Sequence, residues 1–227
     1  TQSILLRGNT TMSEDLTHTW LVTGAASGIG AAVVNRLTAS ENPVIALDVD
    51  DKAGEAIAAD TGATYRHCDV SSYENWQSIV EFLTSGNNQQ GIPSRIHLNA
   101  GVQIAPPSAP MREFSFDAMT SERYRRLMGV NVDGVVFGLH TLLPILKPAT
   151  SIVVTASLAG ITPYPVDPLY AMSKHAVVGL VRSLGPVLAK REIKIHAICP
   201  GGIDTPLVPE AQRSAEVPFM KIGRAHV

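Results

Sequence analysis

The stretch Trp20-Leu21-Val22-Thr23-Gly24-Ala25-Ala26-Ser27-Gly28-Ile29-Gly30 decides the fold. A short apolar run leads directly into three glycines, and a helical pattern follows over about residues 28–40. Glycines at such a turn permit a tight bend, let the backbone approach a pyrophosphate and let the helix pack closely on the strand. The helix start then offers free N–H groups to the phosphates. The same spacing occurs in ordinary strand–helix turns, so its place in the wider pattern matters.

That wider pattern alternates apolar runs with helical segments from residue 20 onward. The predicted strands are Trp20–Thr23, Pro43–Leu47, Thr64–Cys68, Arg95–Leu98, Ser151–Ala156 and Lys194–Ile198. The predicted helices cover about residues 28–40, 52–60, 72–85, 120–146 and 168–191. Such alternation predicts a doubly wound parallel α/β sheet of the Rossmann-like type, in a single dinucleotide-binding domain over residues 18–227. Residues 1–17 are predicted to be an extension, native or added during cloning.

Composition excludes several classes of protein. The chain has 227 residues with 45% hydrophobic side chains and a formal net charge of -2, so we expect neither nucleic acid nor an anionic membrane as a partner. Cys68 and Cys199 are the two cysteines, and they favour reduced thiols in the cytoplasm over a disulfide framework. The histidines lack metal-binding spacing, so no metal site is predicted.

Asp48 ends the second predicted strand, where a carboxylate can accept hydrogen bonds from the adenosine ribose hydroxyls. It would repel a 2′-phosphate, and no Arg or Lys directly after it would offset that repulsion. We therefore expect NAD rather than NADP. The alternative is a solvated acid at a strand end, because Asp50 and Asp51 follow closely.

Two further strand ends carry candidate cofactor contacts. Asp69 follows the third strand, where it can bind the adenine amino group or cap the next helix. Both interpretations stay open at this stage. Asn99, Ala100 and Gly101 follow the fourth strand, and their small size would let the backbone lie beside the adenosine.

Ser157, Tyr170 and Lys174 form the most informative combination. Tyr170 and Lys174 are four residues apart and share one face of a predicted helix, and Ser157 closes the preceding strand. Oxidation of a secondary alcohol needs a base, and free tyrosine titrates near pH 10, so a nearby cation is expected to lower the pKa of Tyr170. Ser157 can donate a hydrogen bond to the reacting oxygen. Alone, the Tyr/Lys pair also fits a solvated helix face.

Over about residues 18–207 the sequence resembles the short-chain dehydrogenases/reductases. The resemblance lies in the order and spacing of the glycine turn, Asn99-Ala100-Gly101, Ser157, Tyr170/Lys174 and Pro200-Gly201. The resemblance implies a catalytic set of Asn131, Ser157, Tyr170 and Lys174, with Asn131 supporting a water near Lys174; a structural helix asparagine is the alternative for Asn131. It also implies that the segment after the sixth strand lines the nicotinamide. The predicted cofactor-binding residues are Gly24, Ser27, Gly28, Ile29, Gly30, Asp48, Val49, Asp69, Val70, Asn99, Ala100, Gly101, Tyr170, Lys174, Pro200, Gly201, Ile203 and Thr205.

Two departures from the family pattern stand out. Leu98 replaces the first of two usual asparagines, and the family's last helix and strand would lie beyond the end of this sequence. The resemblance also implies a homodimer or homotetramer.

The predicted substrate pocket uses residues 102–110, 158–169 and a substrate loop at about 204–220, within which 206–219 line the pocket. These segments offer few charges, and their apolar side chains are Ile104, Ile161, Tyr164, Val166 and Leu207. We expect an NAD-dependent oxidoreductase for a moderately apolar secondary alcohol or ketone, with Tyr170 as acid/base. The alternatives are a non-catalytic dinucleotide-binding module, a nucleotide-sugar epimerase or dehydratase, and an inactive truncated fragment.

Overall fold

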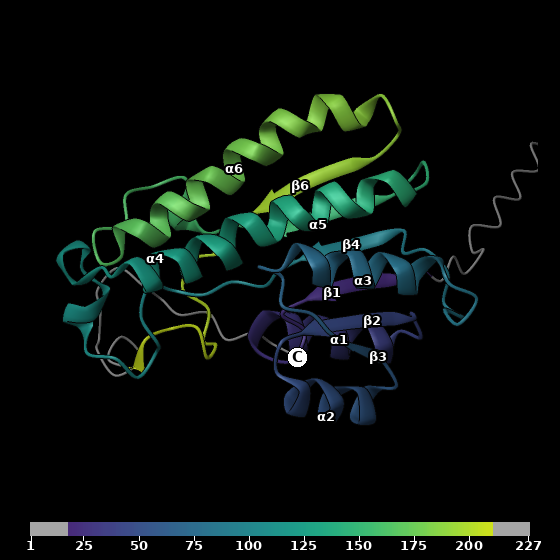
Figure 1. The fold of residues 1–227 in the computed structure, drawn as a ribbon, viewed down its shortest axis with the longest axis horizontal. Helices are drawn as coiled ribbons and strands as arrows, with labels where there is room; N and C mark the ends of the chain where they lie inside the picture. Colours follow the sequence, from purple (N-terminus) through teal and green to yellow (C-terminus); the bar gives the residue numbers. More distant parts are fainter. Residues whose placement is uncertain (1–17, 211–227) are drawn as a thin grey trace, which may run out of the picture.

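The computed structural model describes residues 18–210, in which strands and helices alternate (Figure 1). The strands are β1 (Trp20–Thr23), β2 (Val44–Asp48), β3 (Thr64–His67), β4 (Arg95–Leu98), β5 (Ser151–Thr155) and β6 (Lys194–Ile198). The helices are α1 (Gly28–Ala39), α2 (Asp51–Thr61), α3 (Tyr73–Thr84), α4 (Ser121–Met128), α5 (Gly134–Leu142) and α6 (Pro168–Ala189). The predicted extension at 1–17 and the end of the predicted substrate loop, from 211 onward, lie outside the described residues.

The six strands of the described chain form one parallel sheet in the order β3-β2-β1-β4-β5-β6. Trp20 of β1 is in register with Val44 of β2 on one side and Arg95 of β4 on the other. The carboxyl ends of all strands therefore meet at one edge. The chain reverses its direction of strand addition between β1 and β4, which is where open α/β sheets bind ligands. The predicted doubly wound sheet is confirmed.

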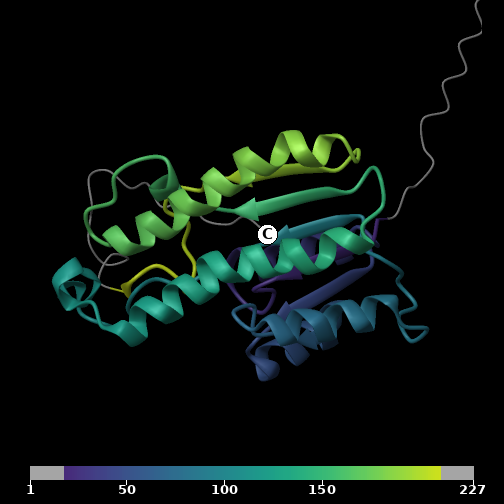
Figure 2. The same ribbon diagram turned by 45° about the horizontal axis from the view of Figure 1, so that its top comes forward.

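Alternate residues of β1 fill two separate cores, one on each face of the sheet. Leu21 packs in the cluster that contains Trp76 of α3 and Leu139 of α5. Val22 packs in a second cluster with Val34 of α1. Figures 1 and 2 show α3, α5 and α6 over one face of the sheet, and α1 and α2 pack against each other. Both faces of the sheet are thus covered at β1 and β2, as near-continuous apolar strands require, whereas alternate residues of β6 (Lys194, His196 and Ile198) are exposed.

The predicted continuous helix over 120–146 is wrong in one respect, because a π-helical segment, η3 (Gly129–Asp133), separates α4 from α5. The apolar pattern runs through the break, so periodicity alone did not indicate it. Gly134 and Gly138 follow the break, and a Cβ at these positions would lie 2.8 Å from Val70 and 2.7 Å from Trp76. The glycines let α5 approach both the β3–α3 connection and α3 closely.

The segment Ser121–Ile145 is also the one stretch of the described residues that is long and apolar enough to cross a membrane by composition. Its buried residues, which include Leu127, Leu139 and Leu142, pack inside the domain. This packing accounts for part of the apolar character of the segment.

Candidate active site

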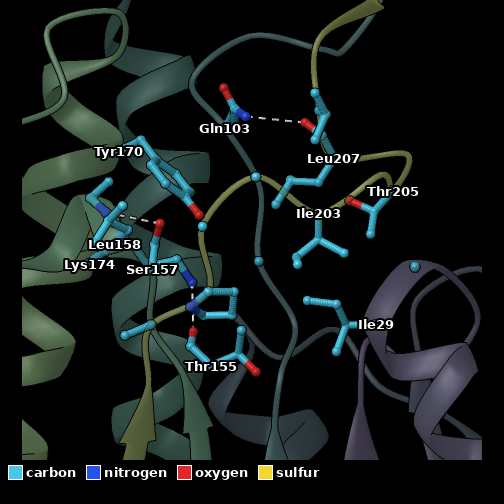
Figure 3. Close-up of a pocket in the computed structure, with 18 of the residues that line it drawn as sticks. Ile29, Gln103, Thr155, Ser157, Leu158, Tyr170, Lys174, Ile203, Thr205 and Leu207 are labelled. Atoms are coloured by element: carbon cyan, nitrogen blue, oxygen red, sulfur yellow. Dashed lines mark hydrogen bonds between the residues drawn. The ribbon is translucent and has the colours of Figure 1, made fainter. Parts of the chain in front are cut away.

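A cavity of about 320 Å³ lies over the carboxyl ends of the strands, running from the glycine turn to the start of α6 (Figure 3). Predicted site residues that line it are Gly24, Ser27, Gly28, Ile29, Asn99, Ala100, Gly101, Ser157, Tyr170, Lys174, Pro200, Gly201, Ile203 and Thr205. Gly30, Asp48, Val49, Asp69, Val70 and Asn131 are not among its lining residues. The cavity thus contains most of the predicted cofactor-binding residues together with Ser157, Tyr170 and Lys174 of the predicted catalytic set.

The glycine turn has no room for side chains at two of its three glycines. Gly24 has φ +62°, and a Cβ there would lie 2.9 Å from Cα of Ala100. A Cβ on Gly30 would lie 1.9 Å from the carbonyl oxygen of Gly24, so Gly30 allows α1 to pack on the turn. Because the turn carries no bulky side chains, a ligand can lie directly against its backbone. Such a turn at the start of α1 is suited to the pyrophosphate of a dinucleotide.

Asp48 supports the glycine turn from β2. One carboxylate oxygen accepts a hydrogen bond from the N–H of Ala26 at 2.8 Å, and the other accepts from the N–H groups of Val49 and Asp50. The carboxylate is therefore fixed by the backbone rather than solvated freely as a strand-end acid. Val49 beside it is 60% exposed, so its side chain is free to meet a ligand from outside the cavity.

Asp69 does not cap α3, so that interpretation is wrong. The cap is Ser72, whose side chain accepts a hydrogen bond from the N–H of Asn75. Asp69 instead accepts hydrogen bonds from the N–H and hydroxyl groups of Ser71. Val70 is buried against Gly134 and belongs to the core.

Asn99 ties together the three central strands at their carboxyl ends. Its backbone N–H donates to the hydroxyl of Thr23 at 2.8 Å, and its side-chain amide donates to the carbonyl of Thr23. Its amide oxygen accepts a hydrogen bond from the hydroxyl of Thr155 at 3.1 Å. The single asparagine before Ala100 is thus sufficient to connect β1, β4 and β5.

Lys174 is almost fully buried, and its ammonium donates to the carbonyl oxygen of Thr155 at 2.9 Å (Figure 3). Burial lowers the pKa of Lys174 to about 8. The same nitrogen lies 3.2 Å from the position of a Cβ on Gly101. A glycine at 101 therefore leaves the ammonium its place beneath the cavity.

Tyr170 and Ser157 present their hydroxyl groups to the same region of the cavity (Figure 3). Burial raises the pKa of Tyr170 to about 12, and a hydrogen bond with Ser157 offsets part of that rise. The expected lowering of this pKa by Lys174 is not present here. The ammonium lies 5.7 Å from the ring centroid, and desolvation of the phenol is the largest cause of the raised pKa.

Asp167 fixes the start of the helix that carries Tyr170. Its fully buried carboxylate accepts from the N–H of Tyr170 at 2.8 Å and from the N–H of Ile104 at 3.1 Å. Burial raises the pKa of Asp167, although these hydrogen bonds pull it in the opposite direction. One carboxylate thus positions both α6 and the loop that follows β4.

Asn131 lies within the π-helical segment and is fully buried. Its amide oxygen accepts from the N–H of Val102, and its amide nitrogen donates to the carbonyl of Val102 and the hydroxyl of Ser173. A Cβ on Gly101 would lie within 3.4 Å of this oxygen. Asn131 therefore holds the chain beside Gly101 directly behind Lys174.

The apolar wall of the cavity differs from the one predicted. Tyr164 and Leu207 line it, but Ile104 is buried in a core cluster, and Ile161 and Val166 are partly exposed away from it. Within the predicted segment 102–110 the residue that lines the cavity is Gln103 instead. The sequence offered no signal for this, because loops lack the periodicity that assigns residues to faces.

No group of three or more His, Cys, Asp or Glu residues that could hold a metal ion occurs between residues 18 and 210.

Comparison with known proteins adds independent support. The family model described as short chain dehydrogenase matches residues 18–216. A 2,5-dichloro-2,5-cyclohexadiene-1,4-diol dehydrogenase of Sphingobium indicum is 35% identical over 206 residues, which cover 88% of this chain and 78% of that protein. A (+)-borneol dehydrogenase of Salvia officinalis is 30% identical over 86% of this chain and 70% of its own length.

Among solved structures, a short chain dehydrogenase/reductase from Burkholderia phymatum in complex with NAD superposes with a TM-score of 0.74 at 25% identity. The match covers 91% of this chain and 73% of that one.

Proposed function

Since the chain belongs to the short-chain dehydrogenase family of nicotinamide-dependent oxidoreductases, we propose that it transfers a hydride between NAD(H) and a moderately apolar secondary alcohol or ketone. The observation that carries the proposal is the grouping of Tyr170, Ser157 and Lys174 around one cavity that continues to the glycine turn. A module that only binds a dinucleotide has no need of these three side chains together.

The cofactor contacts follow from the cavity lining. The glycine turn and the start of α1 would hold the pyrophosphate, and residues 99–101 would lie along the adenosine. Asp48 and Asp69 would meet the ribose and adenine, and the segment 200–205 would line the nicotinamide. When bound, the nicotinamide supplies the acceptor or donor of the hydride.

NAD is the proposed form of the cofactor because the Asp48 carboxylate is held in place by three N–H groups. A second negative charge at about 4 Å would cost roughly 4 kcal/mol before screening, at an effective dielectric of about 20. A 2′-phosphate is therefore disfavoured.

Tyr170 would accept the hydroxyl proton of the alcohol during oxidation and return it to the oxygen during reduction. Its raised pKa in the free protein keeps the phenol protonated at neutral pH, which is the form that gives the proton in reduction. For oxidation, the positive charge of the oxidised nicotinamide and of Lys174 would lower that pKa. Ser157 would donate a hydrogen bond to the reacting oxygen and stabilise its developing charge.

Lys174 would also bind the nicotinamide ribose. Asn131 is proposed to support a water near Lys174, and its hydrogen bonds to Val102 and Ser173 favour a positioning role in the same place.

The substrate class follows from the apolar wall, which includes Leu158, Pro163, Tyr164 and Leu207. An alicyclic alcohol fits such a wall, and the similarity to dehydrogenases named for a cyclohexadienediol and for borneol supports this class.

We further propose a homodimer or homotetramer in the cytoplasm. The exposed apolar side chains of Val136 on α5 and Val187 on α6 favour association through these helices. Light scattering that gives a monomeric mass would contradict this part of the proposal.

The test is an assay of nicotinamide absorbance with NAD or NADP and a panel of alicyclic, open-chain and sugar alcohols. The proposal predicts turnover of alicyclic alcohols with NAD. Turnover confined to sugar alcohols, or equal use of NADP, would contradict the substrate or the cofactor assignment respectively.

A further inference from the structure

Gln103 is the residue whose chemistry the site leaves unexplained. It belongs to the loop after β4 and lines the cavity. In Figure 3, Tyr170 and Ser157 lie on one side of the cavity and Ile203 and Leu207 on the other, with Gln103 between them. The side chain is therefore close to where the part of a substrate beyond its reacting carbon would extend.

The side chain of Gln103 is buried, with only 8% of the residue exposed. One of the two polar atoms of its amide has no hydrogen-bond partner. The amide nitrogen donates to the carbonyl oxygen of Leu207 at 3.2 Å. The amide oxygen has no hydrogen-bond partner and no access to water. A flipped amide would set two carbonyl oxygens against each other, so the unpaired group is an acceptor.

An unpaired buried acceptor is unfavourable by about 1–3 kcal/mol. Native structures contain few such groups, and binding sites are one place where they occur. The terminal torsion of a glutamine is soft, so its oxygen can turn toward a donor in the cavity with little strain. The acceptor of Gln103 is thus available to a ligand hydroxyl.

The cavity lining is mostly apolar, with Tyr164, Pro206, Leu207 and Val208 among its residues beside the hydroxyls of Thr162 and Thr205. Ligand pockets of this kind use a few polar groups to orient a mostly apolar ligand. Ser157 and Tyr170 already serve the reacting oxygen in the proposed function. Gln103 can then recognise a different polar group on the same molecule.

We propose that Gln103 is a specificity-determining residue that accepts a hydrogen bond from a second hydroxyl of the substrate, so that the preferred substrates are alicyclic diols or hydroxyketones. This inference rests on the proposed function, because it takes Tyr170 and Ser157 as the site of the reacting oxygen.

The test compares cyclohexanol with 1,2-, 1,3- and 1,4-cyclohexanediol. For the wild-type protein, kcat/KM for the best diol should exceed that for cyclohexanol by about tenfold, the equivalent of one good hydrogen bond. In Gln103→Leu, which lacks the acceptor, this ratio should fall close to one. Gln103→Glu keeps an acceptor but loses the donor to Leu207, and it should keep most of the preference.

Gln90 provides a matched control, because its amide oxygen is also buried and unpaired but lies outside the cavity. Gln90→Leu should leave the diol preference unchanged. An unchanged ratio in Gln103→Leu would overturn the inference. An equal loss of the diol preference in Gln103→Glu and Gln103→Leu would also overturn it. The preference would then depend on the hydrogen bond to Leu207 and not on the acceptor of Gln103.

Equilibrium binding of the same alcohols to the protein saturated with NADH separates this inference from the proposed function. If no alcohol is turned over, the proposed function fails, but a diol preference in binding that Gln103→Leu abolishes would still support the role of Gln103. Equal binding of cyclohexanol and the diols to the wild-type protein would overturn it.

Discussion

The ammonium of Lys174 donates a hydrogen bond to the carbonyl oxygen of Thr155 at 2.9 Å, and this contact connects the site to a buried polar chain. The hydroxyl of Thr155 donates to the amide oxygen of Asn99 and must therefore accept from Nε2 of His97, which lies 2.8 Å away. His97 thus carries a proton on Nε2, and because burial lowers its pKa to about 4 the imidazole is neutral at pH 7. The carboxyl ends of β4 and β5 hold the lysine through one threonine.

His97 predicts a loss of stability in acid. Burial lowers the pKa of His97 to about 4, so between pH 6.5 and 4 the unfolded chain binds a proton that the folded protein does not. The free energy of unfolding therefore decreases as the pH falls from 6.5 toward 4, and His97 contributes about 3 kcal/mol at most to this decrease. Urea unfolding at pH 7 and pH 4.5 measures this loss, which His97→Gln should reduce. An equal acid loss in both proteins would show that other groups cause it.

Replacement of Lys174 by Met keeps a chain of similar length but removes the cation and the donor to Thr155. We expect kcat to fall about 100-fold or more, because the proton transfer by Tyr170 loses its supporting charge. Lys190→Met, at the exposed end of α6, removes an equal charge and should retain wild-type kcat. Steady-state kinetics with saturating NAD distinguish the two, and a Lys174→Met enzyme of normal kcat would remove Lys174 from the mechanism.

Asp167→Ala should destabilise the protein by about 2–4 kcal/mol. It removes the cap of α6, which is worth about 1 kcal/mol, and leaves the N–H of Ile104 buried without a partner. Asp50→Ala removes the cap of α2 at an exposed position and should cost only about 1 kcal/mol. Urea unfolding tests the difference, and equal losses for the two variants would contradict the double role of Asp167.

Asp48→Asn tests the basis of cofactor choice. Removing the charge should reduce the preference for NAD over NADP by at least tenfold, because the repulsion of the 2′-phosphate is lost. Asp60→Asn makes the same charge change on the exposed face of α2 and should have no such effect. Titration of both dinucleotides measures the ratio. If Asp48→Asn leaves the ratio at its wild-type value, the preference must come from elsewhere.

Much of the fold could be predicted, because most of the strands are short apolar runs that end beside a turn residue; β3, with the sequence Thr-Tyr-Arg-His, is an exception. The Tyr170/Lys174 spacing likewise requires only a helix to bring the two side chains to one face. The break at 129–133 could not be predicted, since the apolar pattern continues through it and the contact of Asn131 with Val102 that accompanies it joins residues distant in the sequence.

The substrate wall was less accessible to sequence reasoning. Ile104 was expected in the pocket because it is an apolar residue of the loop after β4. In the structure its N–H donates to Asp167 and its side chain is buried in the core, while Gln103 lines the cavity. The pKa of Tyr170 was misjudged for a related reason. Spacing revealed the nearby lysine but not how completely the phenol is buried.

The most direct test of the account is the initial rate of NAD reduction with an alicyclic secondary alcohol, measured for the wild-type protein and Tyr170→Phe together with NAD affinity. The account predicts turnover by the wild-type protein and a loss of at least about 100-fold in Tyr170→Phe with NAD affinity retained. Equal turnover by both proteins, or NAD binding without turnover in either, would contradict it.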